Sequence, residues 1–251
     1  MGKNTGNDRR AVVEQLRAQQ RSAERSRGLL VVGVSVLVSV AILGSALWFG
    51  SAVPYVGKKW YDNREFERLA LGSIGAPASA CGEVTTKPAN GNQQHVAPGT
   101  ALSYPDSPPA FGRHYADWES MDRKLYTADD RPPLGKLVHN LEHGYTILWY
   151  DQTAADDDEM MADIEAIAAK YKGTDNFRLK FKAAPWLSTD GAAFPDGQHV
   201  ALTHWSAGGA SAGGTGEQQG VWQYCTAPSG AAVQAFMAQY PYLDSPEPNA
   251  M

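Results

Sequence analysis

The sequence contains little cysteine and, beyond its first residues, little positive charge. Its 251 residues include two cysteines, which excludes a disulfide-rich small domain, a four-cysteine zinc finger and a Cys-x-x-Cys redox centre. Residues 28–251 carry 15 basic and 24 acidic side chains, and the formal net charge of the chain is -5. A chain this acidic does not bind nucleic acid through bulk electrostatics, so nucleic acid is excluded as a partner.

One long apolar run is present, at residues 29–50 (LLVVGVSVLVSVAILGSALWFG), and it contains no charged residue. A helix of this length spans roughly 33 Å, enough to cross a hydrocarbon core of about 30 Å. The run predicts a single transmembrane helix. A cleaved signal peptide ending near residues 50–52 is the rival interpretation, but the apolar core of a signal peptide has only about 7–15 residues.

The flanks of this run predict its orientation. Residues 1–27 contain seven basic side chains, whereas residues 51–70 contain four, interspersed with acidic ones. The positive-inside rule therefore places the N-terminus in the cytoplasm and the larger C-terminal part outside it. We expect a single-pass protein of the cell membrane with a cytoplasmic basic arm (1–28), a transmembrane helix (29–50), a juxtamembrane stalk (51–72) and an extracytoplasmic domain (73–251).

The extracytoplasmic part contains both cysteines. Because two cysteines in an oxidising compartment most simply pair, we predict a disulfide between Cys81 and Cys225. Their Cα atoms are then expected about 4.4–6.8 Å apart.

The pattern of the extracytoplasmic part predicts an α+β fold. Eight prolines lie between residues 77 and 133, which indicates a long Pro/Gly-rich irregular region. Pro132-Pro133 can start a helix that runs to His143. Apolar periodicity then predicts, in order, strand 145–150, a helix from Thr153 to about residue 172, half-buried strand 177–182, strand 199–205, and a last helix capped by Ser229. The strand–helix–strand unit makes the first two strands parallel, and the third returns antiparallel, giving a mixed sheet packed by helices. Five glycines within residues 206–216 indicate a hairpin connection rather than a phosphate loop.

The residues that could carry chemistry are histidines. His139 and His143 are four positions apart and lie on one face of a helix, where both can reach one metal ion. Glu142 is adjacent and suits a neighbouring role, His114 follows a Pro/Gly turn, and His95 is a possible fourth ligand. Imidazoles with a carboxylate suit a transition metal such as zinc or copper.

A structural interpretation of the same residues stays open. The two helical histidines can bond loop carbonyls while Glu142 pairs with Arg113. Formally, the motif matches the His-x-x-Glu-His of inverted zinc peptidases, but that activity needs a further carboxylate, for which Glu159 and Glu165 are the candidates. His199 and His204 alternate with apolar residues and are expected in the core or on the surface. We assign no catalytic residue.

Four motifs carry a resemblance to a known family: PPAFGRH at residues 108–114, LVHNLEHGYTILWY at 137–150, Tyr-Cys at 224–225 and Pro-Glu-Pro at 246–248. Over about residues 80–250 the chain resembles the bacterial family catalogued as domain of unknown function 3105. The resemblance implies the same architecture, with a basic N-terminus, one membrane helix and an external domain. It implies no activity.

Two classes of function follow. The first is a membrane-anchored metal-binding protein, in metal handling or in support of an envelope metalloenzyme, with a small metallohydrolase as a weaker variant. The second is a metal-free envelope module whose loop aromatics dock a protein partner. The aromatics that suit such a surface are Tyr104, Phe111, Tyr115, Trp118 and Tyr126.

The topology gives the first testable prediction. Protease added to intact protoplasts should digest the C-terminal domain and leave the N-terminal arm intact, because the bilayer separates them. Antibodies against tags at the two ends measure this directly, with detergent-lysed cells as the control in which both tags are lost. Survival of the C-terminal tag in intact protoplasts would reverse the orientation.

Overall fold

The computed structural model describes residues 68–89, 93–212 and 215–250. The predicted arm, the predicted membrane helix and most of the stalk lie outside these residues. Within the described ranges, no helix combines the length and the apolar character needed to cross a bilayer.

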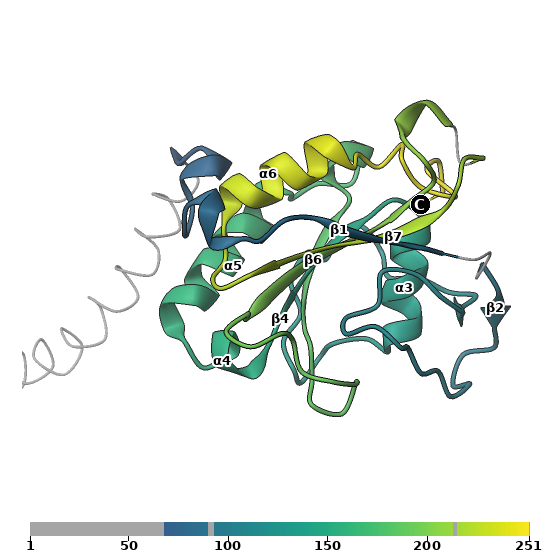
Figure 1. Cartoon of the computed structure of the whole chain (residues 1–251), viewed down its shortest axis with the longest axis horizontal. Coiled ribbons are helices and arrows are strands. Elements are labelled where there is room, and N and C mark those ends of the chain that lie inside the picture. Colours follow the sequence, from purple (N-terminus) through teal and green to yellow (C-terminus); the bar gives the residue numbers. More distant parts are fainter. Residues whose placement is uncertain (1–67, 90–92, 213–214, 251) are drawn as a thin grey trace, which may run out of the picture. The chain divides into compact units, whose positions relative to one another are not determined.

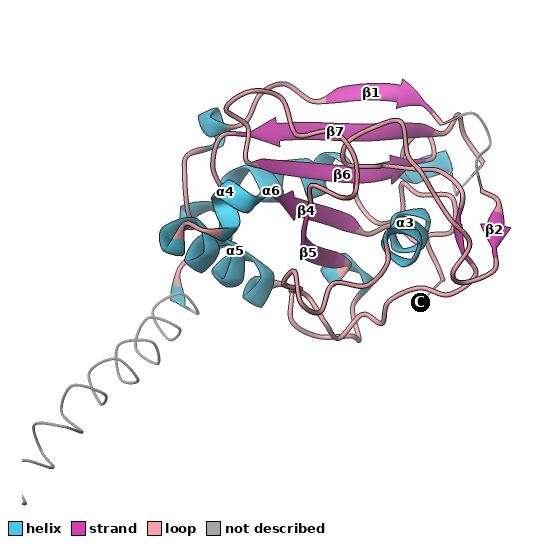
Figure 2. Cartoon of the chain, turned by 90° about the horizontal axis from the view of Figure 1, so that it is seen from below, coloured by secondary structure: helices cyan, strands magenta, loops and turns pink. Residues whose placement is uncertain are grey.

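A mixed five-stranded sheet forms the centre of the domain, with the strand order β1-β7-β6-β4-β5 (Figure 2). Strands β4 and β5 are parallel, and every other neighbouring pair in this sheet is antiparallel. A separate parallel pair is formed by β2 and β3. The strands are β1 (Thr85–Pro88), β2 (His95–Val96), β3 (His114–Tyr115), β4 (Thr146–Tyr150), β5 (Phe181–Pro185), β6 (Val200–Ser206) and β7 (Gln219–Cys225).

Helices cover both faces of the sheet. The α-helices of the described part are α3 (Leu134–Glu142), α4 (Gln152–Ala155), α5 (Asp158–Lys170) and α6 (Gly230–Gln239). Figure 1 shows α6 and α3 on opposite sides of the strands. Strand β4 explains the arrangement, because Leu148 and Tyr150 pack in the cluster with α5 and α6, whereas Ile147 and Trp149 pack in the cluster with α3. The nearly all-apolar sequence of residues 145–150 is typical of a strand that is buried on both faces.

The predicted α+β class and the mixed sheet are confirmed. The crossover through α5 makes β4 and β5 parallel, and β6 returns antiparallel, against β4. The glycine-rich segment connects β6 to β7 as a hairpin, and Ser229 caps α6 by accepting a hydrogen bond from the Ala232 N–H. Strand β7 was not predicted, because Gly220 and the glutamines of QGVWQYC break its apolar alternation.

The long helix predicted from Thr153 was wrong in its start and its continuity. Two aspartates cap two helices in succession. Asp151 accepts from the Ala154 N–H, and Asp157 accepts from the N–H groups of Glu159 and Met160. Each cap requires an extended residue, and the extended Asp157 separates α4 from α5.

The half-buried strand predicted at 177–182 was also wrong. Residues 177–179 form a 3-10 helix, and β5 starts at Phe181 and is buried throughout. The two lysines that suggested a solvated face, Lys180 and Lys182, are themselves fully buried. Lys182 donates to the carbonyls of Ser120 and Arg123, and burial lowers the pKa of this amine to about 7.

The predicted disulfide is confirmed between Cys81 and Cys225. Their Cα atoms are 3.9 Å apart, closer than the expected range, and the two residues face each other across an antiparallel β-bridge. The bond fastens the segment before β1 to the end of β7.

Replacing both cysteines by serine should lower the free energy of unfolding by roughly 4–5 kcal/mol, because the bond closes a long loop in the unfolded chain. Urea unfolding of the full chain in mild detergent measures the loss. A reductant should destabilise the native protein to a similar extent and leave the double variant unchanged. Equal stability of the native chain and the double serine variant would contradict the prediction.

Candidate metal centre

Three elements bring four histidines together at one end of the domain. The parallel β2–β3 pair places His95 directly beside His114. Helix α3 supplies His139 and, at its C-cap, His143. Helix and strand pair pack closely because Gly135 lacks a side chain: a Cβ at this position would lie 2.9 Å from the ring of Tyr115.

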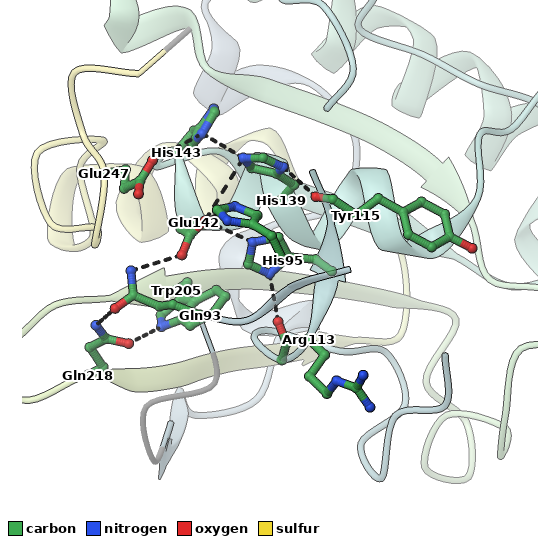
Figure 3. A network of polar contacts seen from close by, with 12 residues as sticks. Gln93, His95, Arg113, Tyr115, His139, Glu142, His143, Trp205, Gln218 and Glu247 are labelled. Carbon is green, nitrogen blue, oxygen red and sulfur yellow. Dashed lines mark hydrogen bonds and ion pairs between the residues drawn. The ribbon is translucent and has the colours of Figure 1, made fainter. Parts of the chain in front are cut away.

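The carboxylate of Glu142 lies at the middle of the cluster and is fully buried (Figure 3). Its Oε2 atom is 2.8 Å from His114 Nε2, 3.4 Å from His95 Nε2 and 3.9 Å from His139 Nε2. Its Oε1 atom accepts a hydrogen bond of 2.8 Å from the Gln93 amide. The carboxylate is therefore central to the cluster, whereas the sequence analysis expected it beside the metal ligands.

Backbone carbonyls fix the orientation of two imidazoles. His139 Nδ1 lies 2.7 Å from the carbonyl oxygen of Tyr115, and His114 Nδ1 lies 2.7 Å from that of Gly112. A carbonyl oxygen only accepts, so both Nδ1 atoms carry hydrogen, and both Nε2 atoms are left to face Glu142. This is the arrangement found around metal-binding histidines, in which one ring nitrogen donates to a carbonyl and the other binds the ion.

A second group of ligand atoms adjoins the first. His143 Nε2 is 2.9 Å from His139 Nε2 and 3.5 Å from Glu247 Oε2. The exposed ring of Trp118 covers this side, with its centroid 4.9 Å from that of His143. Two overlapping sets have all their ligand atoms within 4.8 Å of one another: His95, His114, His139 and Glu142 form the first, and Glu142, His143 and Glu247 form the second.

The protonation of the cluster suits a cation. Burial lowers the pKa of His139 to about 4 and that of His143 to about 3, so both rings are neutral near pH 7 and retain a lone pair. Burial alone would raise the pKa of Glu142, but the contacts with His114 and Gln93 outweigh this effect, and the pKa is lowered. The cluster thus combines a buried carboxylate with the neutral imidazoles of His139 and His143.

A chain of side chains holds the carboxylate in place. Trp205 Nε1 donates to Gln218, the Gln218 amide donates to Gln93, and the Gln93 amide donates to Glu142. Figure 3 shows this chain beneath the histidines. Sequence analysis identified neither glutamine, because a glutamine in a loop gives no chemical signal of its own.

The remaining sequence-derived candidates are placed as follows. The structure brings His95, His114, His139 and Glu142 into one ligand set and puts His143 in the adjoining one. Glu247, from the Pro-Glu-Pro motif, was not among the predicted ligands. Figure 3 shows the Arg113 side chain directed away from Glu142 rather than paired with it.

The other two histidines have structural contacts, as the sequence analysis expected. His199 Nδ1 lies 2.9 Å from a carboxylate oxygen of Asp151. His204 is buried between the carbonyl oxygens of Tyr145 and Asp244.

A family model described as "Protein of unknown function (DUF3105)" matches residues 95–251. The match includes every histidine of the cluster as well as Glu142 and Glu247. Neither the curated proteins nor the solved structures contain a significant match to this chain.

The carbonyl contacts predict which nitrogen carries hydrogen. In the metal-free full chain at neutral pH, His139 should be protonated at Nδ1 only, because Tyr115 offers an acceptor on that side. Long-range ¹H–¹⁵N correlation spectra report the tautomer, and the His139→Ala variant assigns the resonance by its disappearance. A proton on Nε2 alone would contradict the arrangement.

Proposed function

The chain belongs to the DUF3105 family of proteins of unknown function, and we propose that it is a membrane-anchored extracytoplasmic protein that binds a divalent transition-metal ion through His95, His114, His139 and Glu142. Its role is the handling of that metal or the support of an envelope metalloenzyme.

One observation carries the proposal: the Nε2 atoms of three imidazoles converge on one oxygen atom of a buried carboxylate. His114 Nδ1 donates to Gly112, so its Nε2 meets Glu142 at 2.8 Å either as a second N–H or as a bare lone pair. His139 is neutral, and its Nε2 lone pair faces the same oxygen atom at 3.9 Å. A metal cation among these atoms pairs with the anion and accepts the lone pairs that face it.

The donor set indicates the class of metal. Three imidazole nitrogens and one carboxylate oxygen suit Zn²⁺ or Cu²⁺, whereas Mg²⁺ and Ca²⁺ prefer sites built of oxygen. Four-coordinate zinc has Zn–N bonds of about 2.0–2.1 Å. Ligand atoms within 4.8 Å of one another reach a common ion after movements on the order of 1 Å.

The exposure of the ligands supports metal handling. His114, His139 and Glu142 are buried, but the side chain of His95 is 42% exposed. An ion can therefore enter or leave past His95, while the other three ligands stay fixed by the fold. A site that is rigid inside and open at one ligand permits exchange of the metal with a partner.

The hydrolase variant has less support. It requires a carboxylate from Glu159 or Glu165, but both lie on α5, which packs against the face of the sheet opposite α3. Glu142 itself is held by a histidine and by Gln93, and so is not free to act as a base.

The docking module also has less support. Of the five loop aromatics expected to form its surface, Tyr115 and Tyr126 are buried, and Tyr104 and Phe111 pack against the core. Only Trp118 is exposed, at 42%.

The proposal predicts that the purified full chain binds Zn²⁺ and that His139→Ala weakens the binding by more than about 100-fold, since even the loss of a residue that only orients a ligand costs 10–100-fold. Equilibrium dialysis followed by elemental analysis measures both. His199→Ala, which changes a histidine outside the cluster, should bind like the native chain.

Circular dichroism establishes whether His139→Ala keeps its fold, and His114→Ala provides a second test if it does not. A native chain that binds neither Zn²⁺ nor Cu²⁺ would overturn the proposal and leave the structural interpretation of the motif.

A further inference from the structure

The histidine cluster continues past the proposed site, through His143, to a carboxylate near the C-terminus. We infer that a second metal ion binds between Glu142, His143 and Glu247, so that the centre is dinuclear and Glu142 is shared by both ions. This inference rests on the proposed function and extends it from one ion to two.

The ligand groups are too many and too spread out for one ion. Four residues already complete the first set, and His143 and Glu247 group with Glu142 in a set of their own. Six side chains, of which the Glu142 carboxylate is shared, match a pair of ions about 3.5–4 Å apart, the spacing usual for two-metal sites.

The hydrogen bonding of His143 is incomplete among the described residues. His139 Nδ1 donates to Tyr115, so across the 2.9 Å contact between the two Nε2 atoms only His143 can donate. His143 Nδ1 then carries a buried lone pair that has no hydrogen-bond partner among the described residues. In the other tautomer, hydrogen is on His143 Nδ1, which is then a buried donor without an acceptor. The Nε2 atoms of His139 and His143 then face each other with one lone pair each. In this second tautomer, separate ions on the two Nε2 atoms replace the repulsion by two metal–ligand bonds, while Nδ1 still lacks a partner among the described residues.

The C-terminal segment is fastened in place next to His143. The Glu247 N–H donates to the carbonyl of Glu142 over 2.9 Å. The buried Lys180 amine donates to the carbonyl oxygens of His143, Pro248 and Ala250 over 2.7, 3.0 and 2.7 Å. These backbone contacts hold residue 247 next to His143 and do not involve its side chain. The Oε2 atom of Glu247 lies 3.5 Å from His143 Nε2.

The second position differs from the first in its openness. Its side-chain ligands are one imidazole and two carboxylates, and the Glu247 side chain is 45% exposed. The first ion has four protein ligands, three of them buried. The second therefore has fewer protein ligands and keeps coordination positions free on the solvent side.

The test is a Zn²⁺ stoichiometry of the full chain in mild detergent, measured by dialysis and elemental analysis. The native chain should retain two ions, and Glu247→Gln and His143→Ala should each retain one. Glu247→Gln is the cleaner variant, because its side chain is half exposed and its backbone contacts remain. Glu165→Gln, which alters a carboxylate on α5, is the matched control and should retain two.

The outcomes separate this inference from the proposed function. A native chain that holds one ion, unchanged in Glu247→Gln, overturns the second site and leaves the first. A native chain that holds none overturns both. Two ions in the native chain and in both variants would place the second ion elsewhere and overturn the inference.

A spectroscopic readout tests the shared carboxylate. In the Cu²⁺-loaded native chain, two neighbouring ions should couple and give a half-field electron paramagnetic resonance transition. Glu247→Gln should replace it by the spectrum of one isolated Cu²⁺ ion. Two uncoupled signals in the native chain would contradict the dinuclear arrangement.

Discussion

The burial of one carboxylate, that of Glu142, constrains everything around it. A charged group removed from water costs several kcal/mol unless it is paired and hydrogen-bonded. The fold meets this cost with imidazoles on one oxygen and the Gln93 amide on the other. The elements that supply these partners are a helix, a two-stranded ribbon and the loop before it, and together they surround this anion.

The backbone does most of the orienting. Carbonyl groups at Gly112 and Tyr115 determine which nitrogen of His114 and His139 faces the centre. Carbonyls of the C-terminal segment bind the buried amine of Lys180, which holds that segment against the end of α3. Imidazoles that are already oriented by backbone atoms would lose little conformational entropy on binding the proposed ion.

The regular part of the fold was largely predictable, and its errors have local causes. Strand β4 and the caps of α3 and α6 follow from apolar runs and from proline, glycine and serine signals that act over a few residues. The prediction failed where a signal was ambiguous. Asp151 and Asp157 cap two separate helices, which the sequence analysis interpreted as one. Lys180 and Lys182 suggested a strand with one face in solvent. The burial of these amines depends on carbonyl groups from distant segments of the chain. A local stretch of sequence does not include those segments.

The sequence by itself identified most of the residues of the candidate centre, because the spacing of His139, Glu142 and His143 follows from helical geometry. It also predicted the disulfide, because two cysteines allow one pairing within the chain. Only the tertiary structure decided that Glu142 is central, that His95 and His114 are neighbours, and that Glu247 reaches His143. These relations join residues far apart in the chain through packing at Gly135 and the hydrogen bonds of Lys180. Local pattern specifies which side chains an element presents, but contacts between elements depend on how the whole core packs.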